Sequence, residues 1–401
     1  MLRSLLFFLP LTAGAASFTL ESAVSHALRH HPDLAAARCA IAEARGRLAQ
    51  SGRLPNPETE ANLQPNLNGR EFSAELGLVQ RFPLTQRLAL ERAASQAQVA
   101  AAIAEVQAAE QRLAAAVRSA AVKLLSLDAS QALKERLAAN SSQLAAAARQ
   151  TAAQGEGSSL EAAQFELEAQ QLSLDLLQLQ SARADLVGST RPLLGLPPSA
   201  SLSFTGNLAV LPQPQPASPN LPARPDYQAA LARLEAARQE SALARAQRWS
   251  DAGVGLSAKL DRAEDAPDGL RTEGLIGLKF TLPLPLWQQN QGRIQETAAA
   301  ADRAAKELAA LDASVRAEAA AALDSMQAAR RVLAQLSAQL LPKAAQLEAQ
   351  FLAHLQSGQP GAQRSDLLRA REKHLALEQA EIDARLSYHL ALIRYQAALA
   401  R

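Results

Sequence analysis

Few residues of this 401-residue chain have the types and spacing that chemistry requires. His26 and His30 stand four apart on an expected helix, a spacing at which two imidazoles can share one metal ion. No third ligand is evident, so a solvated helix face is the better interpretation, and we expect no metal and no cofactor. The sequence has no glycine-rich phosphate loop, no nucleophile elbow and no cysteine pair. We therefore expect that the protein is not an enzyme.

Charged residues accompany two predicted turns. Glu156 and Glu161 lie at the first turn, and Arg364 and Asp366 follow the second. If several copies met on a symmetry axis, each of these residues would form a ring, and rings of charge select ions in channels. Ordinary helix capping and solvated turn residues explain the same charges equally well.

Long helices must connect these turns to the rest of the chain. Segment 86–154 contains no proline and no glycine and is rich in strong helix formers. Its apolar anchors Val99, Ile103 and Val106 recur at intervals of three and four, as in a coiled-coil seam. At 1.5 Å per residue this helix would be roughly 100 Å long. A helix of that length needs other long helices to pack against.

The N-terminus predicts export of the protein from the cytoplasm. Residues 1–16 have the order of a signal peptide: Arg3, a short apolar core, and small residues that predict cleavage at Ala15 or Ala16. A buried N-terminal helix is the less favoured alternative.

The net charge of +2 gives no reason to expect a nucleic-acid partner, and 3% aromatic residues favour an elongated helical protein. The single Cys39 excludes a disulfide framework.

Four segments are strand-like: about 58–66, 72–82, 251–261 and 272–282. In the last three, apolar side chains occupy alternate positions, which is the two-residue period of a strand. About ten residues is the length of a bilayer-spanning strand, and open strand edges are not tolerated in lipid. Four strands cannot close a barrel, whereas three chains together would supply twelve. Trp249 and Trp287 flank these strands and suit one interfacial aromatic belt, although they could also cap a soluble junction.

The pattern of elements occurs twice along the chain. Landmark residues return in the same order roughly half the chain later, Pro32 as Pro225, Pro83 as Pro283 and Gly155 as Gly358. We expect a first repeat at 17–195 with a helical hairpin at 86–195. A proline-rich extended connector at 196–225 leads to a second repeat at 226–401 with a hairpin at 288–400.

The landmarks resemble the outer-membrane efflux channel family, the TolC-like proteins, over essentially all the mature chain. The matching motifs are Leu20-Glu21-Ser22-Ala23-Val24, His31-Pro32-Asp33-Leu34, Leu54-Pro55-Asn56-Pro57-Glu58, Gln80-Arg81-Phe82-Pro83-Leu84, Gly155-x-x-Ser158 with Leu160-Glu161, Pro225-Asp226 and Leu284-Pro285-Leu286. Within the family the chain resembles the outer-membrane component of RND-type tripartite cation and drug pumps.

The resemblance implies a fold, partners and a location. The fold would be mostly α with a small β part: a long α-helical barrel plus a transmembrane β-barrel shared by a homotrimer, two strands per repeat and four per chain. The duct would lie in the outer membrane of a Gram-negative cell, in contact with lipid, with a large periplasmic part. It would dock a periplasmic adaptor (membrane fusion) protein and work with an inner-membrane pump. The alternative is a periplasmic adaptor or coiled-coil scaffold protein.

The resemblance also assigns roles at the two hairpin ends. Family channels close by inward coiling of the second hairpin, which places Arg364 and Asp366 at the aperture. Pro342 should kink the helix that leads there, because it removes a backbone hydrogen bond. The adaptor-contact tip would comprise Gly155, Glu156, Ser158, Leu160 and Gly358. The second turn is longer than the usual glycine-x-x-serine form, which is a departure from the family.

Overall fold

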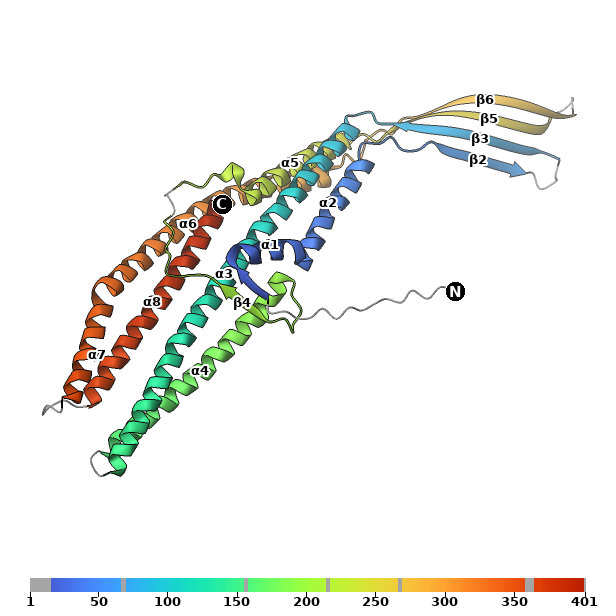
Figure 1. Ribbon diagram of the computed structural model, residues 1–401. Helices are drawn as coiled ribbons and strands as arrows, with labels where there is room; N and C mark the ends of the chain where they lie inside the picture. The colour runs from blue at the N-terminus through green and yellow to red at the C-terminus, as the bar shows by residue number, and fades with distance from the viewer. Residues whose placement is uncertain are drawn as a thin grey trace, which may run out of the picture. The chain divides into compact units, whose positions relative to one another are not determined.

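The computed structural model describes residues 16–65, 70–154, 158–213, 217–265, 269–357 and 364–399 (Figure 1). Most of these residues are helical, and the strands form two small sheets. The expected fold class, mostly α with a small β part and an internal duplication, is confirmed. No helix in the described part of the chain is both long and apolar enough to cross a membrane. The predicted signal peptide lies outside the described residues except for Ala16, so its cleavage stays a prediction.

The two repeats form the same series of elements. The first contains α2 (Pro32–Gln50), β2 (Glu58–Pro65), β3 (Phe72–Phe82), α3 (Arg87–Ala153) and α4 (Ser159–Leu194). The second contains α5 (Pro225–Ala246), β5 (Ala252–Asp265), β6 (Gly269–Thr281), α6 (Gln291–Gln335), α7 (Leu341–Gln356) and α8 (Arg364–Ala398). Pro32 and Pro225 each begin a helix, where the fixed φ and the missing N–H of proline are tolerated.

Some element boundaries differ from the prediction. Helix α2 ends at Gln50, and Gly52 just beyond it adopts a left-handed φ of 69°. The strands of the second repeat are longer than expected, because β5 continues to Asp265 and β6 already begins at Gly269. The long helix α3 matches the prediction closely: it is one unbroken helix of 67 residues.

Packing divides the chain into two units that cut across the duplication. Unit 1 comprises residues 1–36, 108–224 and 313–401, and unit 2 comprises residues 37–107 and 225–312. Each unit therefore combines segments of both repeats. The reason is visible in unit 2, where the strands of both repeats share one antiparallel sheet in the order β2-β3-β5-β6.

Unit 1 contains a second sheet that the sequence analysis did not predict. β1 (Ala16–Thr19) pairs in parallel with β4 (Leu202–Thr205), and a short 3-10 helix, η1 (Leu221–Ala223), follows. β4 and η1 both lie within the predicted proline-rich connector, 196–225. Leu202 and Phe204 are buried, which gives β4 an inner face.

The rest of the connector lies along α8. The Tyr388 hydroxyl donates to the Pro212 carbonyl at 2.6 Å, and the Ala217 amide donates to the Tyr395 hydroxyl at 2.9 Å. Arg224 donates to the Ala398 carbonyl at 2.6 Å at the end of α8. These hydrogen bonds hold the connector against α8. Helix α1 (Leu20–His30), which begins at a capping box, also belongs to unit 1.

The second long helix is interrupted between α6 and α7. The inward-facing residues Met326, Ala329, Leu333 and Leu336 follow at steps of three and four, but the next apolar residue packed on this core is Leu341, five positions on. A π-helical turn, Leu336–Leu340, accommodates the extra residue. Pro342 follows it directly at the start of α7. Proline cannot donate to the helix, and its ring crowds the carbonyl four residues earlier, which accounts for an irregular turn at this place.

Candidate functional site

The sheet of β2, β3, β5 and β6 has one apolar, open face. Its register places Leu78 opposite Leu256 and Leu256 opposite Leu278, so side chains at alternate positions share this face. Ile276, Leu278 and Phe280 are 83%, 71% and 73% exposed. A contiguous apolar surface of this kind indicates that another apolar phase covers it.

The opposite face of the sheet is polar and concave. Lys279 of β6 and Glu60 of β2 form an ion pair of 2.7 Å, although they belong to the two outermost strands. Gly77 lies opposite Glu60 and Gly255 opposite Lys279, so no large side chain separates the pair. A Cβ on Gly255 would stand 2.9 Å from Cγ2 of Val79. The glycines therefore let the sheet curl around a polar hollow of about 180 Å³.

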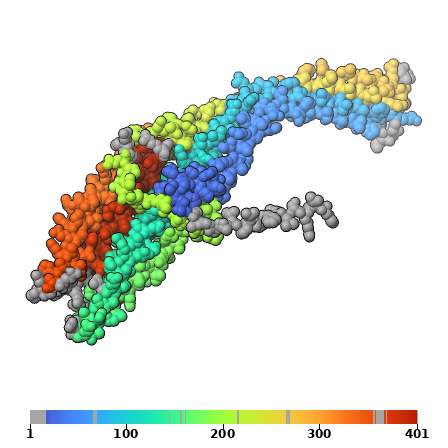
Figure 2. All heavy atoms as spheres, in the orientation of Figure 1, coloured from blue at the N-terminus to red at the C-terminus, as the bar shows by residue number. Residues whose placement is uncertain are grey.

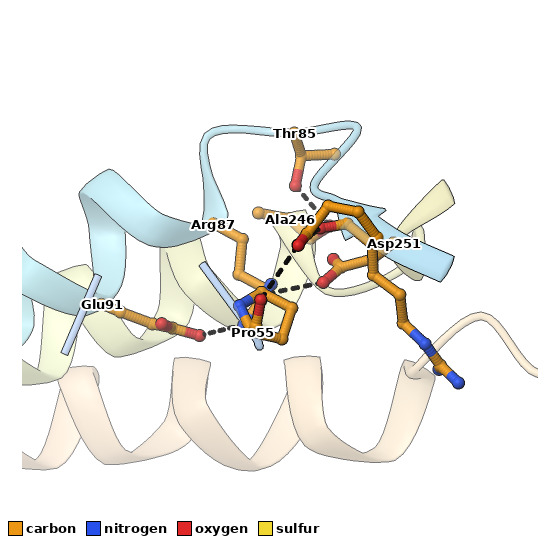
Figure 3. Close-up of polar contacts among 8 residues, drawn as sticks. Pro55, Thr85, Arg87, Glu91, Ala246 and Asp251 are labelled. Atoms are coloured by element: carbon orange, nitrogen blue, oxygen red, sulfur yellow. Dashed lines mark hydrogen bonds and ion pairs between the residues drawn. The ribbon is translucent and has the colours of Figure 1, made fainter. Parts of the chain in front are cut away.

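Arg87, the first residue of α3, joins the strand–helix junctions of both repeats (Figure 3). Its guanidinium pairs with Glu91 at 2.6 Å and with Asp251, just before β5, at 2.8 Å. Burial alone lowers the pKa of Arg87, but its hydrogen bonds and charge interactions with the two carboxylates outweigh burial and raise it. Nearby, the Thr85 hydroxyl donates to the Ala246 carbonyl at 3.1 Å. These contacts thus hold the start of α3 beside the start of β5.

Two tryptophans lie next to this sheet in the chain. Trp249 falls between α5 and β5, and Trp287 follows β6. Their side chains are 40% and 88% exposed, which is unusual for so large an apolar ring. Such exposure fits an aromatic belt at a membrane interface, a role that stays a prediction.

The first hairpin end carries part of the predicted adaptor-contact tip. Ser158 occupies the N-cap position of α4 with an extended backbone, but its side chain makes no capping hydrogen bond to the described residues. Leu160, in the first turn of α4, is 68% exposed. Gly155 and Glu156 lie outside the described residues. An exposed leucine at a helix start is compatible with a contact surface, and the tip stays a prediction.

The second hairpin end carries the predicted aperture. Arg364 is the first residue of α8, and Asp366 lies in the first helical turn, where a carboxylate is favoured by the helix dipole. Gly358 lies outside the described residues. The capping interpretation therefore fits Asp366 as well as the aperture interpretation does.

The histidine pair of α1 is used in packing. The rings of His26 and His30 stack with centroids 4.2 Å apart, and the Phe18 ring lies 5.2 Å from His26. Burial, followed by the charges of His30 and Arg29, lowers the pKa of His26. Within the described ranges, no three His, Cys, Asp or Glu side chains gather into a group that could hold a metal ion.

Polar contacts between α8 and the α3–α4 hairpin were missed by the sequence analysis. Gln379 donates from Nε2 to Ser130 Oγ at 3.0 Å. Burial raises the pKa of Glu168 on α4, while the charge of the buried Arg371 on α8 opposes that rise. A polar residue inside a heptad pattern looks like a solvated position, so no signal in the sequence could have located these contacts.

No protein-family model matches the sequence, and no curated protein matches it significantly. Solved structures, in contrast, match nearly the whole chain. The outer membrane protein VceC from Vibrio cholerae is 21% identical, with 95% of each chain covered and a TM-score of 0.75.

Two further structures agree with this match. The CmeC outer membrane channel of Campylobacter jejuni is 17% identical, with 95% of this chain and 85% of that chain covered and a TM-score of 0.78. The MtrE outer membrane channel of Neisseria gonorrhoeae, in an open state, is 20% identical, with 95% and 88% covered and a TM-score of 0.76. At these identities the likeness shows the fold, which is that of the TolC-like outer-membrane channels. The resemblance inferred from the motifs is confirmed at this level.

Proposed function

We propose that the chain is one protomer of an outer-membrane exit duct, a passive conduit from the periplasm to the exterior. The observation that carries this proposal is the four-stranded sheet, with its open apolar face and its polar concave face. The match to outer-membrane channels over 95% of the chain supports the same conclusion. Lipid would cover the apolar face, and the polar face would line the water-filled path. Such a duct does no covalent chemistry, so the protein is not an enzyme.

The duct is a homotrimer in this proposal. β2 and β6 are the outer strands of the sheet, and each has one edge without a strand partner among the described residues. Unpaired backbone groups in hydrocarbon cost several kcal/mol each, so the edges must pair with other chains. Three copies would supply twelve strands, and the exposed Trp249 and Trp287 would lie at a membrane interface.

The hairpin ends are the proposed periplasmic contacts. Arg364 and Asp366 would form the aperture on the threefold axis, and Pro342 would allow the second hairpin to bend. The tip that binds a periplasmic adaptor of a pump complex would comprise Gly155, Glu156, Ser158, Leu160 and Gly358. The 68% exposure of Leu160 supports this assignment. The adaptor would connect the duct to an inner-membrane pump.

Fractionation tests the proposal. The full chain is expressed in a Gram-negative host, the membranes are separated, and the native mass is measured in mild detergent. We expect the protein in the outer-membrane fraction with the mass of a trimer. A stable, detergent-free periplasmic monomer would overturn the proposal and favour the adaptor or scaffold alternative.

A charge on the lipid face provides the matched variant. Leu278→Lys places an ammonium on the apolar face, where we expect a cost of about 2–4 kcal/mol near the bilayer midplane and less outer-membrane protein. Asn62→Lys adds the same charge on the polar face of β2 and should insert normally. Equal insertion of the two variants would mean that the faces do not divide lipid from water.

A further inference from the structure

Four linkers join helices to the sheet in unit 2, and arginine dominates their charge. Together with the six adjoining residues of each helix, they form the segments 45–57, 83–92, 241–251 and 282–296. These segments contain eight arginines, no lysine and three carboxylates. Glu91 and Asp251 pair with Arg87, and Glu296 pairs with Arg293. The excess of five positive charges is larger than the net charge of +2 of the whole chain.

Six arginines of these segments are left without a carboxylate. None of the six has an ion pair among the described residues, and all six side chains are exposed. We name them the arginine collar: Arg45, Arg47, Arg53, Arg92, Arg245 and Arg248. The nearest carboxylates along the helices, Glu43 and Glu240, lie just outside the segments, and Glu240 accepts a hydrogen bond from Gln98 at 2.9 Å. The collar is therefore a cluster of like charge whose counterions come from outside the chain.

Contacts between the linkers bring these arginines to one place. A Cβ on Gly52 would stand 3.2 Å from Cβ of Arg92, so the chain after α2 lies against the start of α3. The Thr85 hydroxyl, just before α3, donates to a carbonyl at the end of α5. Asn290, just before α6, donates to the Ala244 carbonyl near the same end of α5 at 2.8 Å. Figure 2 shows the ends of α2 and α3 nearest the sheet, in blue and cyan, at the molecular surface. The four linkers therefore meet at one end of the sheet.

Helix dipoles explain only part of this cluster. Arg47 and Arg245 lie in the last turns of α2 and α5, where the partial negative charge of a helix end favours a cation. Arg53 and Arg248 lie beyond these helices, and Arg92 lies near the start of α3, where the dipole does not favour a cation. Like charges repel, so the fold itself gains nothing from placing all six arginines around one junction.

The same linkers expose large apolar side chains. Leu282, Leu284 and Leu286 are 58%, 60% and 63% exposed. Leu282 follows Phe280 at the two-residue spacing of the apolar sheet face, so this linker continues that face toward α6. The linkers contribute further exposed apolar residues, namely Leu54, Leu84, Trp249 and Trp287. The collar thus borders the surface that lipid covers in the proposed duct.

We propose that the arginine collar binds the headgroups of anionic phospholipids in the periplasmic leaflet of the outer membrane, while the exposed apolar residues of the linkers contact the acyl chains. This inference rests on the proposed function, which places the sheet in the outer membrane and the helices in the periplasm. A phosphate diester supplies the negative charge that the collar lacks, and a guanidinium offers it two parallel N–H donors. Basic clusters and exposed aromatic rings at the end of a membrane segment have the composition of such a headgroup contact.

An acidic segment of a partner protein is the other source of negative charge. The position of the collar favours lipid. Arg92 lies near the start of α3, whereas the proposed adaptor-contact tip follows the end of that unbroken helix of 67 residues. The two ends of such a helix are roughly 100 Å apart. The collar is also continuous with the apolar sheet face, and the tip is not.

Tryptophan quenching by brominated lipid tests the contact, because the chain has only two tryptophans. Trp249→Phe leaves Trp287 as the single reporter. The purified trimer of this variant is reconstituted in vesicles of phosphatidylcholine and phosphatidylglycerol, with bromine on the acyl chains of one lipid or the other. The difference in quenching gives the relative binding constant of the two lipids. We expect phosphatidylglycerol to bind several-fold more tightly at low salt, and this preference to decrease at high salt.

Two pairs of substitutions separate the collar from charge in general. In the Trp249→Phe background, Arg245→Gln with Arg248→Gln should lower the preference for phosphatidylglycerol roughly fivefold for each arginine that contacts a phosphate. Quenching in pure brominated phosphatidylcholine should not change. Arg303→Gln with Lys306→Gln is the matched control, which removes two exposed charges roughly 15–20 Å beyond the start of α6 and should keep the preference. Helical circular dichroism and the native mass verify that each variant remains a folded trimer.

Three results would overturn the inference. They are equal binding of the two lipids, the same loss of preference in the control variant, and no quenching of Trp287 by either lipid in a conducting trimer. Each would leave the proposed duct intact, whereas a chain that is neither trimeric nor in the outer membrane would reject both. If Arg245→Gln with Arg248→Gln weakens binding of a purified adaptor and leaves the lipid preference unchanged, the collar docks protein and not lipid.

Lipid retained by the trimer provides a second test. The protein is extracted from outer membranes in mild detergent and analysed by native mass spectrometry without added lipid. We expect bound anionic phospholipid on the unsubstituted protein and less of it on Arg53→Gln with Arg92→Gln. Retention of lipopolysaccharide in place of phospholipid, unchanged by these substitutions, would contradict the assignment to the periplasmic leaflet.

Discussion

Arg87 should be the side chain on which the strand–helix junction depends most. Arg87 and Asp251 are only 21% and 16% exposed, and Arg87 also pairs with Glu91. Removing one partner of a buried ion pair costs about 3–5 kcal/mol, because the other charge is left without a partner. Some water still reaches this pair, so for Arg87→Met we expect about 2–3 kcal/mol. For units of 150–250 residues that corresponds to a fall in the melting temperature of roughly 4–12 °C.

The assay is thermal unfolding of the purified protein, followed by helical circular dichroism. Arg87→Lys should recover only part of the loss, since an ammonium cannot bridge two carboxylates as a guanidinium fork does. The double variant Arg87→Met with Asp251→Asn should be more stable than the sum of the single losses predicts. Arg293→Met is the control, because the Arg293–Glu296 pair is exposed and should contribute little. Equal losses in Arg87→Met and Arg293→Met, or strict additivity in the double variant, would refute the reasoning.

Three further predictions concern the sheet, the connector and the aperture. Gly255→Ala should destabilise the sheet by about 1–3 kcal/mol through overpacking, whereas Gly274→Ala, with nothing within 4 Å of its Cβ, should be neutral in the same melting assay. Burial lowers the pKa of His389 from its ordinary value of 6.5, so below that pH the unfolded chain binds a proton that the folded chain does not. The melting temperature should therefore decrease when the pH is lowered from 7.5 to 5.5, and His389→Gln should make that decrease smaller. If the decrease is the same in His389→Gln, another group causes it. Asp366→Ala should change conductance or cation preference while Glu156→Ala does not, and the opposite result would mean that the two turns have exchanged roles.

Local signals explain what the sequence could predict. Segment 86–154, without proline or glycine, became α3 at Arg87–Ala153, because strong helix formers dominate the segment. Alternation of side chains predicted β3 at its exact limits, Phe72–Phe82. Pro32 and Pro225 mark helix starts in both repeats because proline acts on its own backbone.

Contacts between distant segments explain what the sequence could not predict. β4 is a strand because Leu202 and Phe204 pair with Ala16 and Phe18 of β1. Its four residues are too few to show a strand pattern in the sequence. The π-helical turn before Pro342 depends on one extra residue in the spacing of the inward-facing side chains of α6 and α7. That extra residue can be recognised only when the buried side chains are known. A proline alone predicts a bend but not the form of the turn.

The candidate site shows the same division. The apolar face of the sheet followed from alternation, and the exposure of Leu278 agrees with it. The pairing of Lys279 with Glu60 across two intervening strands could not be foreseen, since it needs the register of the whole sheet and the glycines beneath. Arg87 and Asp251 belong to different repeats, and nothing in either local sequence marks them as partners.

Conductance in a planar lipid bilayer is the measurement that tests the exit duct most directly. The purified full chain, reconstituted as a trimer, should give discrete and reproducible conductance steps, because three sheets would together enclose a polar path. Leu278→Lys should lower the frequency of insertion, and Asn62→Lys should insert at the original frequency with an altered preference for anions over cations. A protein that binds the bilayer yet never conducts, with or without an added adaptor, would contradict the proposal that this chain forms a conduit.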